Sequence, residues 1–432
     1  MQIRRIVAVL IFVASLVTGH WSFSQATSPY SRYGLGYVRS TVFSANKAMG
    51  EVAAPYASSV NINFTNPASY ASLTRTTVEI GANFDGVRIF TRDSTYRANS
   101  ASINHFALAF VPNPKRNAWA ISIGLLPYTN INYTFIQNFN DTNSVGSYRE
   151  IFSGKGSLYQ AYAGGAYKVK GFSVGANAGF LFGKLDYQKT ILFPDSVGAY
   201  GTRNLTNMNL KSFVYSVGIQ YQRRIFHNNN EPDVRNDIFV TVGAYGSGGM
   251  KMQAKLSNYW ERFSSTSAGF EIIDTIQGNF DKSEKVTLPF NMGLGVMFGN
   301  ERFWMLGTDF KFMNWKKYDS PLNNAGLSDS WRFSFGAQIT PRYDDRKFFN
   351  RVQYRLGGYY GQSEINFNGK SLNETGGTVG LGIPFKSAAR LNVTGDFGTR
   401  GGSDKSAIRE TYYRFTLGFV VNDIWFIKRK FD

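Results

Sequence analysis

Large apolar residues alternate with small or polar residues in many short segments of this chain. In 105–110, three large apolar residues alternate with His105 and two alanines, and the same pattern recurs in 332–337 and 413–419. Side chains of a β-strand point alternately to its two faces, so this pattern predicts strands with one apolar and one small or polar face. Periodicity alone does not separate a membrane barrel from a soluble sandwich, because the apolar face can meet either lipid or a core.

Fourteen such segments can be traced, an even number, as bacterial barrels require. They are 77–90, 101–112, 117–128, 156–169, 172–188, 208–225, 237–250, 284–298, 303–314, 330–341, 351–362, 373–384, 388–399 and 409–421. Their connections alternate in length: 113–116, 170–171, 299–302 and 385–387 are short, and 129–155, 189–207 and 251–283 are long. If the first strand starts on the periplasmic side, every short connection falls on that side and every long one outside. We therefore predict an all-β fold, a fourteen-stranded antiparallel transmembrane β-barrel over 77–421, rather than a sandwich, which would need several domains and a linker.

The first residues have the pattern of an export signal. Arg4 and Arg5 precede an apolar run that begins at Ile6, and small residues follow near position 24. The run is shorter than the ~20 residues that a spanning helix needs, so residues 1–24 are predicted to be a secretory signal peptide, with cleavage after Ser24 or Ala26. An exported chain without spanning helices can still cross a membrane as a closed barrel, which places it in the outer membrane.

Charge and composition exclude several classes of function. The chain of 432 residues has 47 Lys and Arg against 29 Asp and Glu, a net charge of +18. Removal of Arg4 and Arg5 with the signal peptide leaves +16. The basic residues are scattered rather than clustered, so we expect no nucleic-acid partner. The absence of cysteine excludes disulfide scaffolds and thiolate metal sites.

Aromatic and glycine residues fit the faces of a barrel. The chain is 16% aromatic and has 44 glycines. Glycines are expected to face the lumen, where space is short. Aromatic residues near strand ends are expected to form the two girdles at the membrane interfaces: Trp119, Tyr128, Trp304, Trp315, Trp331 and Tyr359.

No motif indicates catalysis. No His and Glu spacing resembles a zinc site, and His105 has no partners in sequence that would make it part of a hydrolase triad. A single histidine near a strand end is better interpreted as a polar lumen residue. We therefore expect neither an enzyme nor a bound metal or cofactor.

The segment 25–76 precedes the first strand and does not alternate. It contains Ala48-Met49-Gly50-Glu51 and then Asn66-Pro67-Ala68 just before the first strand. A barrel of fourteen strands is too wide for its own side chains to fill. This segment is therefore predicted to be an N-terminal hatch, or plug.

These motifs and their order resemble the FadL-type outer-membrane transport family, whose members carry long-chain fatty acids and other hydrophobic compounds. The resemblance implies a passive transporter with an N-terminal hatch, past which the ligand moves near Asn66, Pro67 and Ala68. It also implies a kink in the third strand that opens a lateral exit into the membrane. In this chain the third strand contains Leu126-Pro127-Tyr128. Proline cannot donate a ladder hydrogen bond, so Pro127 either breaks the strand there or simply ends it at the outer interface.

The same resemblance leaves a second function open. Some barrels of this type are partners in outer-membrane protein secretion or assembly complexes, and the long connections and the basic segment 422–432 could serve for docking. This segment is either a periplasmic tail or the end of the last strand. A polar porin is disfavoured by the hatch. The expected partners are outer-membrane lipid and lipopolysaccharide, a hydrophobic small molecule and other outer-membrane proteins. The sequence does not name the ligand.

Overall fold

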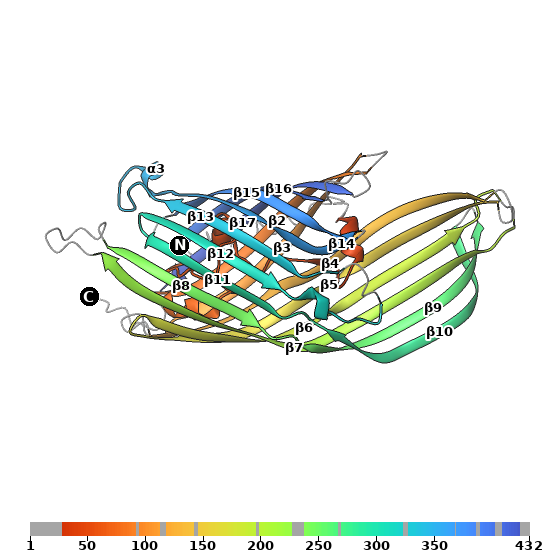
Figure 1. Ribbon diagram of the computed structural model, residues 1–432, viewed down its shortest axis with the longest axis horizontal. Helices are drawn as coiled ribbons and strands as arrows, with labels where there is room; N and C mark the ends of the chain where they lie inside the picture. Colours follow the sequence, from red (N-terminus) through yellow and green to blue (C-terminus); the bar gives the residue numbers. More distant parts are fainter. Residues whose placement is uncertain are drawn as a thin grey trace, which may run out of the picture.

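The computed structural model describes residues 28–91, 95–112, 118–141, 146–195, 198–226, 237–266, 269–322, 327–367, 369–385, 389–401 and 408–423. The predicted signal peptide and the residues after Asp423 lie outside this part of the chain. The structure is one antiparallel β-sheet that closes on itself, because the last strand pairs with the first strand of the wall (Figure 1).

The N-terminal segment, residues 28–75, contains only short elements. These are η1 (Pro29–Arg32), β1 (Tyr37–Val38), α2 (Ser44–Lys47) and η2 (Pro67–Ser72). The wall strands are β2 (Thr76–Phe90), β3 (Thr95–Phe110), β4 (Trp119–Asp141), β5 (Gly146–Val169), β6 (Phe172–Leu192), β7 (Gly201–Phe226), β8 (Ile238–Ser247), β9 (Lys251–Thr266), β10 (Gly269–Thr287), β11 (Asn291–Asn300), β12 (Trp304–Met313), β13 (Ser330–Ile339), β14 (Gln353–Phe367), β15 (Lys370–Pro384), β16 (Ala389–Gly401) and β17 (Arg409–Asp423). Two further short helices, η4 (Trp315–Lys317) and α3 (Phe348–Arg351), lie in the connections.

The wall has fourteen strands around the barrel, as predicted. The second half of β7 pairs with β8 and its first half with β9, so β8 and β9 are two parts of one strand. In the same way β11 pairs with β8 while β10 pairs with β9. Closure pairs the first wall strand with the last, so the sheet has no terminal strand with a free edge.

The alternation of the sequence becomes the two faces of the wall. Ile80, Phe106 and Leu417 point outward and are 40%, 46% and 39% exposed. Glu79 and Thr416 point inward and are buried. An apolar outer face and a polar inner face are typical of a membrane barrel. Within the described ranges, no helix is both long and apolar enough to cross a bilayer.

The long connections predicted at 129–155, 189–207 and 251–283 were wrong, because they are mostly strand. A spanning strand needs only ~9–11 residues, and β8 and β11 have 10 each. The strands β4 to β7 instead have 23, 24, 21 and 26 residues. The outer parts of β4 to β7, together with β9 and β10, continue the sheet beyond the other strands, and we call this extension the outer ledge (Figure 1).

Part of the predicted aromatic girdle was also wrong. Trp119 and Trp304 are exposed on the outer face, but Trp315 and Tyr359 are buried inside the barrel. Tyr128 also packs against a buried apolar cluster. Sequence position near a strand end does not reveal which of two adjacent residues faces inward, and bulges change that parity.

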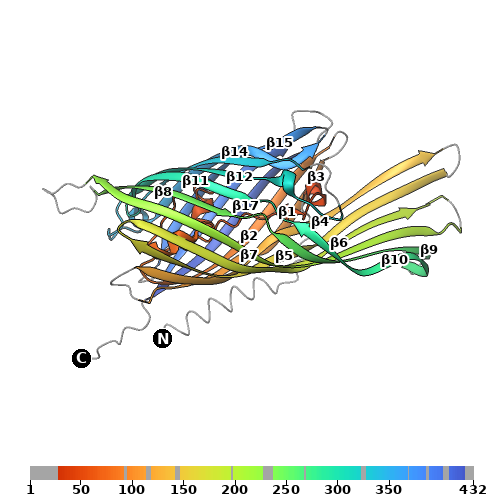
Figure 2. The ribbon, with the colours of Figure 1, turned by 60° about the horizontal axis from the view of Figure 1, so that its bottom comes forward.

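The N-terminal segment lies inside the ring of strands (Figure 2). Its backbone approaches the wall where the wall has glycine. A Cβ atom on Gly175 would lie 2.5 Å from the carbonyl carbon of Pro67, and one on Gly243 would lie 1.9 Å from the carbonyl oxygen of Ala54. These contacts explain why inward-facing glycines recur in the strands.

A substitution of Gly175 by alanine tests this close approach. The added methyl group would push against the backbone of η2, so we expect the free energy of unfolding to fall by about 1–3 kcal/mol. The matched control is Gly165→Ala on the neighbouring strand β5, where a Cβ would meet only Ala120 O at 3.6 Å. Urea unfolding in lipid vesicles measures both. Equal stability of the two variants would show that the wall does not need glycine at the contact.

Candidate functional site

The strands β3 and β4 share an unusually short ladder. Only Phe106–Phe110 of β3 pair with Ile121–Leu125 of β4, although β3 starts at Thr95 and β4 continues to Asp141. Beyond Leu125, toward the outer side, no further pairs between the two strands are described. We call this divergence of β3 from β4 the seam.

Both strands have a bulge where the seam begins. Asn104 of β3 is skipped in the register with β2, and Tyr128 of β4 is skipped in the register with β5. A bulge bends its strand, and Pro127 next to Tyr128 has no N–H to offer to a ladder. The residues Leu126-Pro127-Tyr128 therefore lie directly beyond the last shared pair. Leu126 itself points inward and is 2% exposed.

The N-terminal segment covers the freed edge of β4 from inside the barrel. Tyr37 and Val38 of β1 pair with Asn130 and Thr129, and Arg39 N donates to Tyr128 O at 2.9 Å. The approach depends on Gly36, which has a φ of +94° and whose added Cβ would lie 2.8 Å from Asn130 O. Sequence reasoning missed this contact, because a strand of two residues has no periodicity to detect.

Carboxylates of the wall hold the backbone of the N-terminal segment elsewhere. Asp309 of β12 accepts from Ala53 N at 3.0 Å and from Ala54 N at 2.5 Å. Glu301, between β11 and β12, accepts from Ser59 N at 2.9 Å. An irregular buried backbone has N–H groups without internal partners, and these side chains supply them.

Partly buried ion pairs attach the segment to the wall formed by β13 to β17 and β2. Arg332 lies 2.7 Å from Glu51 of the segment and 2.6 Å from Glu374 of β15. Arg39 lies 2.6 Å from Asp85 of β2. Burial opposes ionisation of Glu51, but Arg332 together with a hydrogen bond from Ser40 and the charges of Lys47 and Lys311 holds the pKa of Glu51 below its usual value. Charges buried in this way are tolerated because each has a close partner.

Lys47 is a half-buried cation with weaker partners. Its Nζ lies 3.3 Å from Asn83 Oδ1 and 3.4 Å from Asn104 Oδ1 at the bulge of β3. Burial lowers the pKa of Lys47 to about 8. Among the described residues, these two amide oxygens are its hydrogen-bond acceptors. A positive charge therefore lies just inside the seam, and a ligand anion could bind there.

Two apolar clusters flank the seam on the inside. The outer apolar cluster lies on the inner faces of β4 to β7, β9 and β10, with contributions from the N-terminal segment and η4. Its buried members are Leu35, Ile131, Tyr133, Leu158, Leu181, Leu185, Met208, Leu210, Val214, Met252, Ala254, Val286, Leu288, Trp315 and Tyr318. Apolar residues on the inner wall differ from the polar lining of a water-filled porin.

The inner apolar cluster lies on the side of the seam away from the outer ledge. It contains Leu126 together with Phe43, Tyr70 and Ala71 of the N-terminal segment and Tyr162 of β5. The ring of Phe43 stacks on the buried ring of His105 at 3.6 Å, so His105 faces the lumen.

The predicted hatch motif lies at the base of the same region. The Asn66 side chain accepts from Ala68 N at 3.2 Å and donates to Ala54 O at 2.7 Å, which caps η2 and fixes the preceding turn. Pro67 is the first residue of η2, where its missing N–H costs nothing. Asn66, Pro67 and Ala68 are buried against β6 and β7. The structure connects them to Leu126 through Tyr70 and Ala71 rather than by direct contact.

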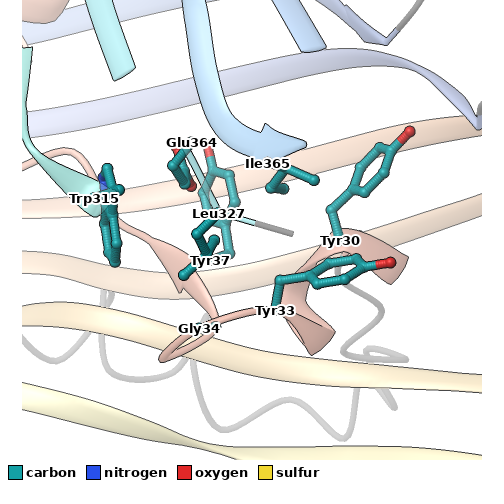
Figure 3. A pocket seen from close by; sticks show the side chains of 9 residues that line it. Tyr30, Tyr33, Gly34, Tyr37, Trp315, Leu327, Glu364 and Ile365 are labelled. Carbon is teal, nitrogen blue, oxygen red and sulfur yellow. The ribbon is translucent and has the colours of Figure 1, made fainter. Parts of the chain in front are cut away.

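Two hollows lie near the candidate site and on the outer face. One lies between η1, η4 and β14 and is lined by residues that include Tyr30, Tyr33, Tyr37, Trp315 and Leu327 (Figure 3). Its volume is about 10 Å³, room for roughly one water molecule. A larger hollow of about 440 Å³ lies on the outward face, lined by residues such as Ile219, Leu294 and Phe310. Within the described residues, no group of three or more His, Asp or Glu is arranged to hold a metal ion.

One family model matches the chain over nearly its whole length. A family model described as BamG matches residues 2–432. The chain belongs to the BamG family. No curated protein matches the chain.

Solved structures show the same fold at low sequence identity. A Pseudomonas aeruginosa FadL homologue has a TM-score of 0.60 at 13% identity and covers 90% of this BamG-family chain and 99% of its own. The Pseudomonas putida toluene transporter TodX has a TM-score of 0.56 at 13% identity, with coverages of 89% and 99%. The Ralstonia pickettii toluene transporter TbuX has a TM-score of 0.52 at 12% identity, with coverages of 88% and 98%. The resemblance to FadL-type proteins is therefore confirmed for the fold, while the sequence family is BamG.

Replacement of Arg332 by glutamine tests the attachment of the N-terminal segment. It leaves Glu51 and Glu374 buried without this cation, so we expect a loss of about 3–5 kcal/mol in the free energy of unfolding. Proteolysis should also reach residues 37–51 sooner.

The control is Arg262→Gln on the outer ledge. Arg262 also lies 2.6 Å from a carboxylate, Asp274, but both side chains are 43% exposed. Solvent already screens that pair, so stability should hardly change. If Arg332→Gln were as harmless as the control, the partly buried pairs would not be what attaches the segment.

Proposed function

We propose that this barrel lies in the outer membrane and passes a hydrophobic small molecule from the outer surface sideways into the membrane through the seam. The observation that carries this proposal is the end of the β3–β4 ladder after Phe106 and Leu125, with β1 hydrogen-bonded to the freed edge of β4. The wall is interrupted there. The two-residue strand β1 covers the interruption, in place of a neighbouring wall strand. The transport named for TodX and TbuX agrees with such a role.

In this proposal the N-terminal segment is the hatch. Its base, Asn66-Pro67-Ala68, stays fixed against β6 and β7, and Tyr37 and Val38 move away from β4. The ligand first meets the outer apolar cluster, which includes Leu35 of the hatch. It then leaves beside Leu126, Pro127 and Tyr128 into the lipid.

Lys47 makes a long-chain carboxylate the ligand that fits best. The apolar clusters would hold the chain of such a molecule, and the ammonium group inside the seam would attract its head group. A plain hydrocarbon would gain nothing from this charge.

The substitution Lys47→Met separates these two ligand classes. We expect the affinity of the purified barrel for oleate to fall by about 10- to 150-fold, because a hydrogen bond to a charged group contributes about 1.5–3 kcal/mol. Affinity for octadecene should be unchanged. Lys316→Met, on an exposed lysine of η4, is the control, and calorimetry measures binding. An equal loss of affinity for oleate and for octadecene would show that Lys47 does not select carboxylates. If the unaltered barrel bound neither ligand, the transport proposal would be rejected.

A disulfide between β1 and β4 tests whether the hatch has to move. Val38 and Thr129 are register partners, and the chain has no cysteine of its own, so Val38→Cys with Thr129→Cys can form only the intended bond. We expect oxidised cells to lose uptake of labelled oleate and to regain it on reduction.

The control pair is Asn138→Cys with Arg149→Cys, which are register partners on β4 and β5 of the outer ledge. These strands stay paired in our account, so oxidation should leave uptake unchanged. Full uptake by the oxidised Val38–Thr129 variant would show that the ligand does not leave beneath β1.

A second candidate function is favoured by the family match. The name BamG points to outer-membrane protein assembly, and the match extends over residues 2–432. As an accessory subunit of an assembly complex, the barrel would keep its N-terminal segment fixed and contribute surfaces to partner proteins. The Val38–Thr129 disulfide distinguishes the two functions, because it would stop transport and leave assembly of other outer-membrane proteins intact.

A further inference from the structure

The strand β10 forms one margin of the outer ledge. It pairs with β9 over its length, whereas β11, the next part of the same wall strand, pairs on both sides with β8 and β12. From Phe270 to Val286, no strand is described on the other edge of β10. Figure 1 shows β10 at the border of the ledge, away from the shorter strands β12 and β13.

This edge strand is apolar and exposed. Phe270, Ile272, Ile273, Ile276 and Phe280 are 57%, 52%, 46%, 57% and 65% exposed. Ile273 lies at a register shift against β9, so the regular alternation of faces is interrupted there. All five side chains are nevertheless exposed, so the rest of the barrel does not cover them.

If β11, with 10 residues, is the membrane-crossing part of this wall strand, the outer part of β10 lies beyond the lipid. Thr287 is the end of β10 next to β11, and Ile276 lies 287 − 276 = 11 residues farther toward the outward end of β10. At roughly 3.3 Å per residue and a tilt of about 45°, this places Ile276 about 25 Å farther from the membrane than Thr287.

Natural proteins usually protect such an edge with lysine, proline or a covering segment. The stretch 269–281 reads Gly-Phe-Glu-Ile-Ile-Asp-Thr-Ile-Gln-Gly-Asn-Phe-Asp and contains neither lysine nor proline. Three register shifts against β9, at Ile273, Ile276 and Phe280–Asp281, are bulges that protect an edge in part. The apolar side chains at these bulges remain exposed. The edge therefore has the properties of a site for strand addition by another chain.

Charge indicates what kind of chain fits. The outer stretch 269–281 has three acidic residues, Glu271, Asp274 and Asp281, and no basic residue. Asp274 is paired with Arg262 of β9 at 2.6 Å, and the basic residues Lys282 and Lys285 follow only after this stretch. A second copy is a poor occupant, because it would bring the same acidic charges to the edge. Two copies in one membrane also point the same way, so their β10 strands would run parallel, a pairing slightly weaker than the antiparallel one used throughout this sheet.

We propose that β10 is a docking strand for an extended segment of another protein at the outer surface, with apolar residues alternating with lysine or arginine. The segment adds to the sheet beside Phe270–Asp281 and places its apolar side chains against Ile272, Ile276 and Phe280. This inference stands whether or not the barrel conducts a ligand.

Synthetic strands test the chemistry on the purified full-length barrel. The probes are two eleven-residue peptides, one alternating valine and lysine and one alternating valine and glutamate. We expect the lysine peptide to bind about tenfold more tightly and to slow amide hydrogen exchange within 270–286. The substitution Ile276→Lys should weaken its binding about tenfold, since it adds a like charge at the edge. Ile136→Lys, at an isoleucine of β4 on the ledge that is 53% exposed, is the matched control and should leave binding unchanged.

A photo-crosslinking residue at position 276 or 136 of the full chain, in intact cells, tests the site in its natural setting. We expect position 276 to link to an extended segment of another protein with the stated pattern, and Ile276→Lys to abolish copurification of that protein. Crosslinks between two copies of the barrel, crosslinks to a helix, or equal crosslinking from positions 276 and 136 would overturn the proposal. Unchanged binding of the lysine peptide to the Ile276→Lys variant would also overturn it. Oleate uptake measured in the same cells should not change with Ile276→Lys, so failure of the transport proposal is recorded separately.

Discussion

A buried or lipid-exposed backbone needs a partner for every N–H and C=O group, and this requirement organises the whole molecule. The wall meets it by closing β17 onto β2. The ladder is incomplete at the seam between β3 and β4 and along the outer edge of β10. At the seam the chain supplies its own partner, β1, whereas the edge of β10 is available to another chain. The two functional proposals arise from these two interruptions of one sheet.

The interior shows why the N-terminal segment can occupy the barrel without forming a regular structure of its own. Its backbone N–H groups bind wall carboxylates such as Asp309, and its acidic residue Glu51 pairs with Arg332. Glycines remove the wall side chains where the two backbones touch. Lys47 differs from these arrangements, because its charge is half-buried with amide oxygens as hydrogen-bond acceptors. The weakest part of the attachment thus lies beside the seam.

The barrel could be predicted from the sequence because lipid imposes a period of two on every spanning strand, as in 413–419. The outer ledge is not predicted, because a membrane requires only ~9–11 residues of each strand and nothing in the alternation shows that strands continue beyond the lipid. Long stretches such as 251–283 are therefore interpreted as loops. Pro127 could be singled out because proline lacks a donor, but the role of Asn104 depends on register, which no local pattern reveals. The pairing of Val38 with Thr129 joins residues far apart in sequence and has no local signal at all.

The central claim is that the wall opens between β3 and β4 and that β1 closes this opening from inside. It is tested most directly by an experimental structure of the barrel in a lipid bilayer with bound oleate. Our account predicts that the β3–β4 ladder still ends at Phe106 and Leu125, that β1 has moved away from Thr129 and Asn130, and that the acyl chain lies beside Pro127 with its carboxylate near Lys47. A continuous β3–β4 ladder beyond Leu125, or oleate bound elsewhere with β1 still paired to β4, would contradict it.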